Sequence, residues 1–470
     1  MNRLCSRLEV LSSSEIEAIH RASSRILERV GVRLPHAGCR ELCRKIGAAV
    51  DDTAEIVRFP RPLLDSLIAG LRRNASRTEG DPDRPARLDG VISTQLNLVD
   101  YGSGERRAGT LADVLKGIRL VQNLKNFPTC NAVVIPSDVE QPLTDVVSFQ
   151  AIYSYSRKPG ATYVLTPFSA RYVLELAAAA ETSVWFLLDP VSPLQYRAEN
   201  IEIALLFAQA GQPLYIGSMV MAGATGPVTL AGTLALHNAE LLATLCLVFA
   251  MTERYGCSVY NSGPHTMDLK TMLCSFGSPN QALLGAGMAQ LGRFYGIQRV
   301  CNSGLTDALR PDFQAGAEKA MTGLFTVLAG AQSIGCQGIV GADQGFSFEQ
   351  LVLDNEWLEM YNYLLSGIEV NEETIAAEVI ERAGIGGNFL ADEHTGLHMR
   401  KNMFQSRIFR RESWDAWVTG NRSGAEQRAR DYVVAMTEGK GALEPVCTPG
   451  QFEAFERIVS DARRHLPAMD

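Results

Sequence analysis

Residues Gly223–Glu240 read GATGPVTLAGTLALHNAE, a glycine-rich turn followed by the start of a long apolar helix. The apolar run Pro213–Ser218, PLYIGS, comes shortly before them and predicts a buried strand. Pro227 and Thr229 suit the first turn of a helix that continues towards Met251. Strand, turn and helix form half of a parallel β/α unit, which places ligands at the carboxyl end of its strand. The bare turn allows a ligand or partner to approach closely, although its glycines could equally serve only to close the connection.

The same alternation of strand and helix recurs along the chain. Apolar runs that each precede a turn and a helical segment occupy Ala132–Ile135, Thr162–Leu165, Val184–Leu188, Leu214–Gly217, Ser258–Tyr260, Arg299–Cys301 and Gln337–Val340. This rhythm predicts an α/β fold, a (β/α)8 barrel of the TIM type. An open doubly wound sheet is the alternative, but no GxGxxG motif follows an early strand.

Helical segments flank the predicted barrel on both sides. The expected organisation is an N-terminal helical region over 1–90, the barrel over 91–370, and a C-terminal helical region over 371–470 that packs on the barrel. In the first region, serines before Glu15 predict a helix cap, and Ile16, Ile19 and Ile26 share one helical face. The polar segment Arg77–Arg87 is expected to be an exposed connector. Thr110 and Asp113 predict the start of a further helix.

Composition restricts the class of protein. The net charge is −8, and the basic residues are scattered, which disfavours nucleic-acid binding. No apolar segment is expected to be long enough to cross a bilayer, and no signal peptide is evident, so the chain is expected to be cytoplasmic. The ten cysteines form no CxxC pair, and the histidines form no HExxH motif. His394 and His398 have one-turn spacing but lack an obvious third ligand, so no metal site is predicted.

Polar residues follow the predicted strands, where they would share one mouth of the barrel. They are Pro136, Ser137, Asp138, Thr166, Phe168, Asp189, Ser192, Ser218, Met219, Asn261, Ser262, His265, Asn302, Ser303, Asp307, Gly341, Asp343 and Gln344. About half of them would only cap the next helix, because Asp and Ser after a strand commonly do so.

Several motifs, in order, carry a resemblance to a known family. They are LSSSEIEAIHRASSRILERVGV, SPLQYRAEN, GATGPVTLAGTLALHNAE, GSPNQALLGAGMAQLGRFYGI and TDALRPDFQAGAEK, followed by LVLDNE. Together they resemble the trimethylamine methyltransferase superfamily from about residue 10 to about residue 460. The resemblance implies a barrel that moves a methyl group from a methylated amine to the cobalt of a separate corrinoid protein.

One segment separates two branches of that superfamily. The trimethylamine enzymes carry pyrrolysine in the mouth, in the neighbourhood that matches Gly338–Gly345, where this chain reads GIVGADQG. The chain therefore resembles the non-pyrrolysine branch, whose known members use quaternary amines such as glycine betaine. The resemblance also implies that this chain binds no cofactor of its own, since the methyl acceptor is the cobalamin of the partner protein.

A quaternary ammonium cannot donate a hydrogen bond, so its pocket is expected to offer aromatic faces and a few carboxylate or amide groups. The predicted substrate-binding residues are Asn97, Tyr101, Phe168, His265, Asp343, Gln344, Phe346 and Phe348. Gly223 and Gly226 are predicted to face the corrinoid partner. Each aromatic residue has core packing as its alternative role.

Other readings stay open. The chain could act on a different methylated compound, or on a tertiary amine by some other means. It could also be a non-catalytic barrel that binds or senses a methylated amine. A metal-dependent hydrolase is a third, weaker alternative. Self-association is expected, with no nucleic-acid or membrane partner.

Overall fold

The fold is built around a parallel sheet whose strands are far apart in the sequence. The structure, a computed structural model, describes residues 7–75, 87–255 and 259–466. The sheet contains β4 (Asp89–Ile92), β7 (Phe186–Leu188), β8 (Leu214–Ile216), β10 (Val259–Ser262), β13 (Gln298–Cys301) and β14 (Ser333–Gln337). Its order is β4-β14-β13-β10-β8-β7, and every pairing is parallel. The first of these strands in the sequence thus pairs with the last.

Two extended segments, 130–135 and 159–165, lie in the sequence between β4 and β7. The Gln95 N–H donates to the Val133 carbonyl at 3.0 Å, and the Cys130 N–H donates to the Lys158 carbonyl at 2.7 Å. These contacts form isolated parallel bridges rather than ladders, so the strands predicted at Ala132–Ile135 and Thr162–Leu165 are absent as strands. The predicted α/β class with a parallel sheet is confirmed, whereas an unbroken eight-stranded ladder is not observed.

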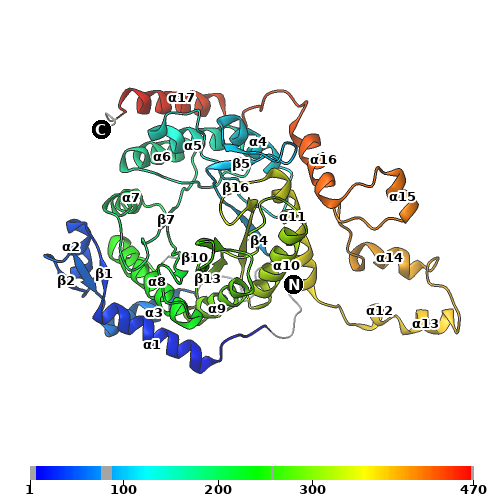
Figure 1. The fold of residues 1–470 in the computed structure, drawn as a ribbon, viewed down its shortest axis with the longest axis horizontal. Helices are drawn as coiled ribbons and strands as arrows, with labels where there is room; N and C mark the ends of the chain where they lie inside the picture. The colour runs from blue at the N-terminus through cyan, green and yellow to red at the C-terminus, as the bar shows by residue number, and fades with distance from the viewer. Residues whose placement is uncertain (1–6, 76–86, 256–258, 467–470) are drawn as a thin grey trace.

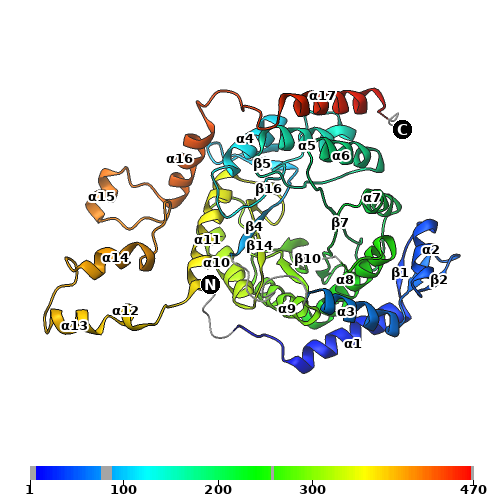
Figure 2. The same cartoon turned by 180° about the vertical axis from the view of Figure 1, so that it is seen from behind.

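Helices surround the sheet in a ring, as Figures 1 and 2 show from opposite sides. They are α4 (Leu111–Val121), α5 (Thr144–Tyr155, after the short helix η1 at Gln141–Leu143), α6 (Pro167–Ala179), α7 (Ala198–Gln209), α8 (Leu230–Thr252), α9 (Pro279–Tyr295), α10 (Phe313–Leu328) and α11 (Phe348–Ser366). Thr110 and Asp113 form the predicted capping box of α4. Helix α8 is apolar enough and long enough to span a membrane, contrary to expectation, but 83% of its most apolar window is buried inside the fold. It is a core helix.

Two small sheets extend the loops that follow the parallel strands. One contains β9 (Met221–Ala222), β11 (His265–Asp268) and β12 (Leu273–Ser275). The other contains β5 (Asn97–Val99), β6 (Arg106–Ala108), β15 (Ile339–Val340) and β16 (Gly345–Phe346). Because these strands follow β8, β10, β4 and β14, both sheets stand at the carboxyl ends of the parallel strands. We call this end of the ring the mouth.

The N-terminal region combines helices with a sheet that sequence patterns did not predict. Helices α1 (Ser13–Arg29), α2 (Ala37–Lys45) and α3 (Arg61–Ala75) lie in the expected helical region, and Ser12 and Glu15 form a capping box. Between them, β1 (Val32–Arg33), β2 (Ala49–Asp51) and β3 (Ile56–Arg58) form an antiparallel sheet. The expected connector lies outside the described residues except for Arg87, and β4 crosses the expected boundary at residue 90.

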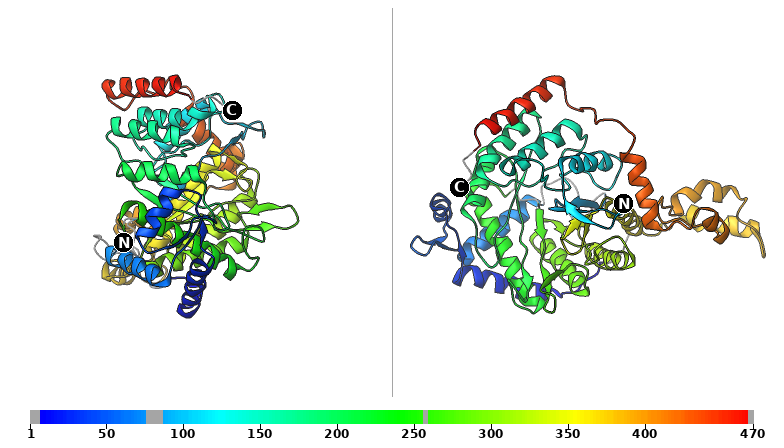
Figure 3. Two further views of the ribbon diagram at one scale, coloured as in Figure 1. Left: turned by 90° about the vertical axis from the view of Figure 1, so that its left-hand side faces the viewer. Right: turned by 45° about the horizontal axis from the view of Figure 1, so that its top comes forward.

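The C-terminal region has two parts with different environments. Helices α16 (Ala425–Thr437) and α17 (Pro449–Arg464) pack on the ring, with buried side chains that include Val433 and Phe455. Helices α12 (Glu372–Ile375), α13 (Ala377–Ala383), α14 (Glu393–Asn402) and α15 (Trp414–Thr419) bury no residue. They form an arm that projects away from the ring, visible in Figures 1 and 3.

Candidate functional site

The inward face of the ring remains accessible along β7 and β8. Phe186 packs on Phe207 of α7, with ring centroids 5.5 Å apart, so this side chain faces outward. Successive side chains of a strand point to opposite faces, so Leu187 faces inward. Tyr215 pairs with Leu187 in register and shares its face. Leu187 and Tyr215 are partly accessible, whereas Phe186 and its outward neighbours are buried. Close packing therefore does not fill the inward face at these strands.

An aromatic pair lies on this inward face. Trp185 is two residues before Leu187 and shares its direction, and its ring lies 5.1 Å from that of Tyr215. Both aromatic side chains are partly accessible. An accessible aromatic surface of this kind can hold a cation through the negative potential of the ring faces. Sequence reasoning missed both residues, since an apolar run of a buried strand does not reveal which face looks inward.

Asp343 is a carboxylate of the mouth. It accepts a hydrogen bond from Nε2 of Gln95 at 2.5 Å. Its side chain is accessible to solvent, yet partial burial raises the pKa of its carboxyl, and the bond from Gln95 opposes that rise. Ala342 and Asp343 have φ of 50° and 74°, a left-handed conformation that costs energy in residues with a side chain. The loop is therefore held in a fixed and strained shape around this carboxylate.

Two further carboxylates follow parallel strands. Asp189 comes after β7, in the inward alternation of Trp185 and Leu187, and enclosure by the protein raises its pKa to about 6. Asp307 comes after β13, and burial raises its pKa too. It accepts hydrogen bonds from the backbone N–H groups of Phe276 and Gly277, so it anchors the turn before α9. Asp189 is the more exposed of the two, and Asp307 is partly accessible.

His265 is buried in a network of amides. Its Nδ1 lies 2.9 Å from Oε1 of Gln281, whose Nε2 donates to the Asn302 carbonyl at 2.9 Å. Nδ2 of Asn302 lies 3.3 Å from Nε2 of His265, and Nε2 of Gln337 donates to Oδ1 of Asn302 at 2.8 Å. This arrangement fits a neutral ring that donates from Nδ1 and accepts at Nε2. Burial lowers the pKa of His265 to about 4, which agrees with the neutral form.

His265 is therefore covered rather than open to a ligand, since it is 0% exposed. Asn302 and Gln337 are partly accessible and stand between it and the mouth. The structure joins His265 of β11, Gln281 of α9, Asn302 after β13 and Gln337 of β14 in one hydrogen-bonded set. Gln281 and Gln337 were not predicted, because an isolated glutamine in a helix or strand carries no sequence signal.

Glu240 fixes the loops after β7 and β8. This buried carboxylate of α8 accepts hydrogen bonds from the Ser192 hydroxyl at 2.7 Å, the Ser218 hydroxyl at 2.5 Å and the Leu194 N–H at 2.8 Å. Ser192 and Ser218 were placed at the mouth by sequence, and the structure gives them this anchoring role. Burial raises the pKa of Glu240.

Two further predicted residues, Asn97 and Gln344, belong to the sheet of β5, β6, β15 and β16 and its turn. Asn97 donates to the Gln344 carbonyl at 3.5 Å, and Arg106 donates to Oε1 of Gln344 at the same distance. Tyr101 follows β5, is partly accessible, and has a pKa that desolvation raises. The structure thus groups Asn97 and Gln344 next to Asp343. Phe168 lies in the first turn of α6, where its ring centroid is 5.1 Å from that of Tyr172.

Phe346 and Phe348 do not reach the mouth. They are 0% and 3% exposed, and their rings pack edge to face with centroids 5.3 Å apart. Phe346 would also collide with any side chain at Gly338. The structure does not support their prediction as substrate contacts, because Phe346 of β16 and Phe348, the first residue of α11, both pack in the core.

A buried ion pair supports the segment that precedes Asp343. Nζ of Lys319 lies 3.0 Å from Oδ2 of Asp354, and both side chains are 0% exposed. Lys319 also donates to the Gly304 and Cys336 carbonyls, and Asp354 accepts from the Gly338 N–H at 2.9 Å. Burial raises the pKa of Asp354 to about 6, with Lys319 opposing the rise. The pair thus ties α10 and α11 to the strand end at Gly338.

The turn at Gly223–Gly226 lies on the rim of the mouth, at the end of β9. The Met221 carbonyl accepts from the N–H groups of Ala224, Thr225 and Gly226. Gly223 has φ of 87°, and Leu269 and Val228 lie 3.4 and 3.8 Å from the place where a Cβ would sit. Both neighbours are more than 60% exposed. Together with exposed Met272, they form an apolar rim beside the glycine turn.

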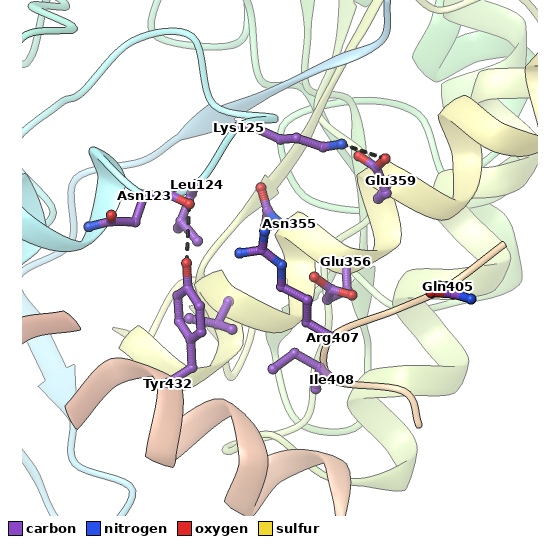
Figure 4. Close-up of a pocket in the computed structure, with 11 residues that line it drawn as sticks. Asn123, Leu124, Lys125, Asn355, Glu356, Glu359, Gln405, Arg407, Ile408 and Tyr432 are labelled. Carbon is purple, nitrogen blue, oxygen red and sulfur yellow. Dashed lines mark hydrogen bonds and ion pairs between the residues drawn. The ribbon is translucent and has the colours of Figure 1, made fainter. Parts of the chain in front are cut away.

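A separate pocket of about 170 Å³ lies between α11, the end of α4 and the C-terminal segment (Figure 4). Lys125 pairs with Glu359 at its edge at 2.6 Å, and the Tyr432 hydroxyl donates to the Asn123 carbonyl. Ligand pockets usually measure about 300 Å³ or more, so we assign no ligand to it. Among the described residues, no group of three or more His, Cys, Asp or Glu side chains has a metal-binding arrangement.

Carboxylates, amides and an accessible aromatic pair at one end of a parallel α/β sheet define a class of small-molecule enzymes whose loops carry the site. The sequence profile of the trimethylamine methyltransferase family matches residues 1–460, and the chain belongs to this family. It is a methyltransferase.

Relatives of known activity cover nearly the whole chain. The chain is 29% identical over 445 residues to trimethylamine methyltransferase MttB of Desulfitobacterium hafniense, covering 91% of this chain and 89% of that protein. It is 31% identical over 448 residues to MttB1 of Methanosarcina acetivorans, covering 91% and 90%. It is also 28% identical over 440 residues to a glycine betaine methyltransferase of Desulfitobacterium hafniense, covering 89% and 90%.

Among solved structures, the monomethylamine methyltransferase of Methanosarcina barkeri is similar, with a TM-score of 0.46 and 10% identity over 96% of this chain and 92% of that one. A hydroxylamine complex of MtmB has a TM-score of 0.47 and 11% identity, over 96% and 91%.

Proposed function

We propose that this chain transfers a methyl group from a quaternary amine resembling glycine betaine to cob(I)alamin on a partner corrinoid protein. The observation that carries the proposal is the accessible carboxylate of Asp343, held by Gln95 within a segment made of ordinary residues. The family gives methyl transfer, and a carboxylate at the mouth favours a substrate with a fixed positive charge.

The segment Gly338–Gly345 offers no covalent helper for a tertiary amine. A tertiary amine holds its methyl group through a neutral nitrogen, which is a poor leaving group. A quaternary nitrogen already carries a positive charge, so it can leave as a neutral tertiary amine. The electron pair of Co(I) forms the new cobalt–carbon bond, and the nitrogen keeps the electron pair of the carbon–nitrogen bond that breaks. The protein then needs to position the methyl carbon and stabilise charge rather than form a covalent adduct.

The site residues divide this work. Asp343 and Asp189 provide negative potential for the trimethylammonium group, and the faces of Trp185 and Tyr215 provide a polarisable wall. Asn97, Gln344, Asn302 and Gln337 provide amide groups, of which the side-chain N–H donors suit a substrate carboxylate. His265 keeps Asn302 oriented from behind.

In our proposal the ring is a barrel of eight β/α units. The extended segments 130–135 and 159–165 take the places of its second and third strands. The mouth then opens towards the corrinoid partner. The apolar rim of Val228, Leu269 and Met272 beside Gly223 and Gly226 is the surface that we assign to this partner, because exposed apolar patches commonly mark protein contacts. The chain itself binds no cofactor in this proposal and acts in the cytoplasm.

The test is product analysis. Purified chain is mixed with a corrinoid protein held as Co(I) and with glycine betaine, and dimethylglycine is measured by NMR. Formation of dimethylglycine that depends on both proteins supports the proposal. If neither glycine betaine nor any other quaternary amine yields its demethylated product, the proposed reaction is wrong.

A non-catalytic sensor of methylated amines is the alternative. It predicts that calorimetry detects binding of a quaternary amine, while no methyl group reaches cobalt under any condition. The family assignment favours the enzyme.

A further inference from the structure

The arm formed by residues 367–424 carries apolar side chains that no other described part of the chain covers. Ile368, Val370, Ile385, Leu390, Leu397 and Trp414 are each at least 70% exposed. At an order of magnitude of 100 Å² of apolar surface for each large side chain, these six alone expose on the order of 600 Å². This sum is taken over the whole length of the arm, and it approaches the ~800 Å² per partner of a standard interface.

The arm keeps its shape through its own contacts. Arg382 pairs with Asp392 at 2.8 Å, and Lys401 pairs with Glu369. Helices α12, α14 and α15 of the arm carry the side-chain caps Asn371, Asp392 and Ser413. It is therefore a formed element with apolar faces turned to solvent. We expect a formed apolar surface of this size to be covered by another protein.

Charge along the arm identifies the occupant. Residues 367–393 contain seven carboxylates and one arginine, whereas residues 394–424 contain six basic residues and two carboxylates. One arm thus has an acidic limb and a basic limb. If two copies of the chain are related by a twofold axis, the acidic limb of each arm lies beside the basic limb of the other arm. The same contact then occurs twice. This surface is complementary to itself.

The position of the arm also separates it from the mouth. Helix α11 begins at Phe348, directly after β16 at the mouth, and the arm leaves its far end at Ser366. A protein that accepts a methyl group must reach the mouth instead. A groove of about 690 Å³ at the root of the arm, lined in part by Phe404 and Phe409, offers a receiving surface for a second arm. Figure 2 shows the arm standing clear of the ring.

We propose that residues 367–424 are the surface through which two copies of this chain associate, with the arms paired in opposite directions. Ile385 and Leu390, at the turn between the limbs, are buried by the second copy. The acidic and basic limbs set the register.

The first test is the mass of the full chain in solution, by sedimentation velocity at micromolar concentration. The wild type is expected to sediment with at least twice the chain mass. The double variant Ile385→Asp/Leu390→Asp is expected to weaken association at least tenfold and to sediment as a single chain. Val30→Asp is the matched control, because Val30 is 55% exposed on α1, outside the arm. A wild type of single-chain mass, or a double variant that associates like the wild type, would overturn the proposal.

A charge exchange tests the pairing itself. One variant carries Glu372→Lys, Glu378→Lys, Glu381→Lys and Glu393→Lys, and the other carries Arg400→Glu, Arg410→Glu and Arg411→Glu. Each alone is expected to be a single chain, because both limbs of a pair then have the same sign. An equal mixture is expected to regain the larger mass, since each acidic limb again meets a basic one. Failure of the mixture to associate, with both variants folded by circular dichroism, would contradict the antiparallel pairing.

Discussion

Asp343 is the residue on which substrate charge recognition depends in this account. Replacing it by Asn keeps its size and its contact with Gln95 but removes the negative charge. A charged contact of this kind is worth about 1.5–3 kcal/mol, so Asp343→Asn is expected to weaken quaternary-amine binding about 10- to 100-fold. Calorimetry with glycine betaine measures the change. Asp65→Asn, on the surface of α3, serves as the control and should leave affinity unchanged; equal affinities for all three proteins would remove Asp343 from the site.

His237 gives the fold a dependence on acid. It is fully buried in α8, and both of its ring nitrogens lack a hydrogen-bond partner among the residues that the structure describes. Burial lowers its pKa to about 3, from an ordinary value of 6.5. Between these values the unfolded chain binds a proton that the folded chain does not, so stability is complete above pH 6.5 and falls as the pH decreases.

The variant His237→Leu removes the one proton that the unfolded chain binds at this position and the folded chain does not. The unfolding temperature of the variant is expected to fall less than that of the wild type between pH 7 and pH 5, and to be no lower at pH 7. Calorimetric unfolding at both pH values measures this. The same fall in both proteins would show that His237 is already protonated or solvated in the native state.

Single residues were predictable from sequence where a strand end fixed their position. Asp343 lies at the mouth, next to Asn97 and Gln344, because all three stand in loops after parallel strands. Phe346 was misplaced, since the short strand β16 reverses direction and turns it inward. Trp185 and Tyr215 needed the structure, because only the packing of Phe186 on α7 shows which face of β7 looks inward.

At the scale of elements, the pair Lys319–Asp354 holds α10 and α11 against the strand end at Gly338. Breaking a buried pair leaves one charge unpaired and typically costs about 3–5 kcal/mol, so Lys319→Met is expected to lose that much stability. Chemical denaturation measures it. Lys401→Met, which breaks the exposed pair with Glu369, should cost less than about 1 kcal/mol. If both variants lost a similar amount of folding free energy, the buried pair would contribute no more to stability than the exposed one.

The turn after β9 tests the assignment of the rim. Gly223→Val strains a left-handed position and adds bulk between Val228 and Leu269, so it is expected to slow methyl transfer to the corrinoid protein at least tenfold. Substrate affinity should change less than threefold, since the turn lies on the rim rather than at Asp343. Gly47→Val is the matched control, because Gly47 has φ of 96° and open space around it, away from the rim. Equal loss of transfer and of substrate binding would count against the rim as the docking surface.

Helices and strands whose own residues carry a sequence pattern were predictable. Elements that depend on contacts with distant residues were not. The helices opened by Ser12 and Thr110 carry capping boxes that can be read directly from the sequence. Strands β1 and β3 contain two and three residues, too few to show an alternation of polar and apolar side chains. The segments 130–135 and 159–165 have apolar strand composition, but their hydrogen bonds depend on distant neighbours.

At the scale of the whole molecule, periodic strand and helix signals predicted the parallel α/β arrangement, because each unit repeats the same pattern. The arm could not be predicted. Its short helices have ordinary amphipathic composition, and only the structure shows that their apolar faces are exposed among the residues it describes. The ring and the arm then have separate roles in our account: the mouth transfers the methyl group and the arm joins two chains.

The most direct test of the central claim is a comparison of glycine betaine with trimethylamine under identical conditions. The chain is mixed with a corrinoid protein held as Co(I), and methyl-Co(III) formation is followed by the absorbance of the cobalt. Because GIVGADQG contains no group that activates a tertiary amine, methyl transfer is expected from the quaternary amine and not from trimethylamine. Faster transfer from trimethylamine would contradict the account.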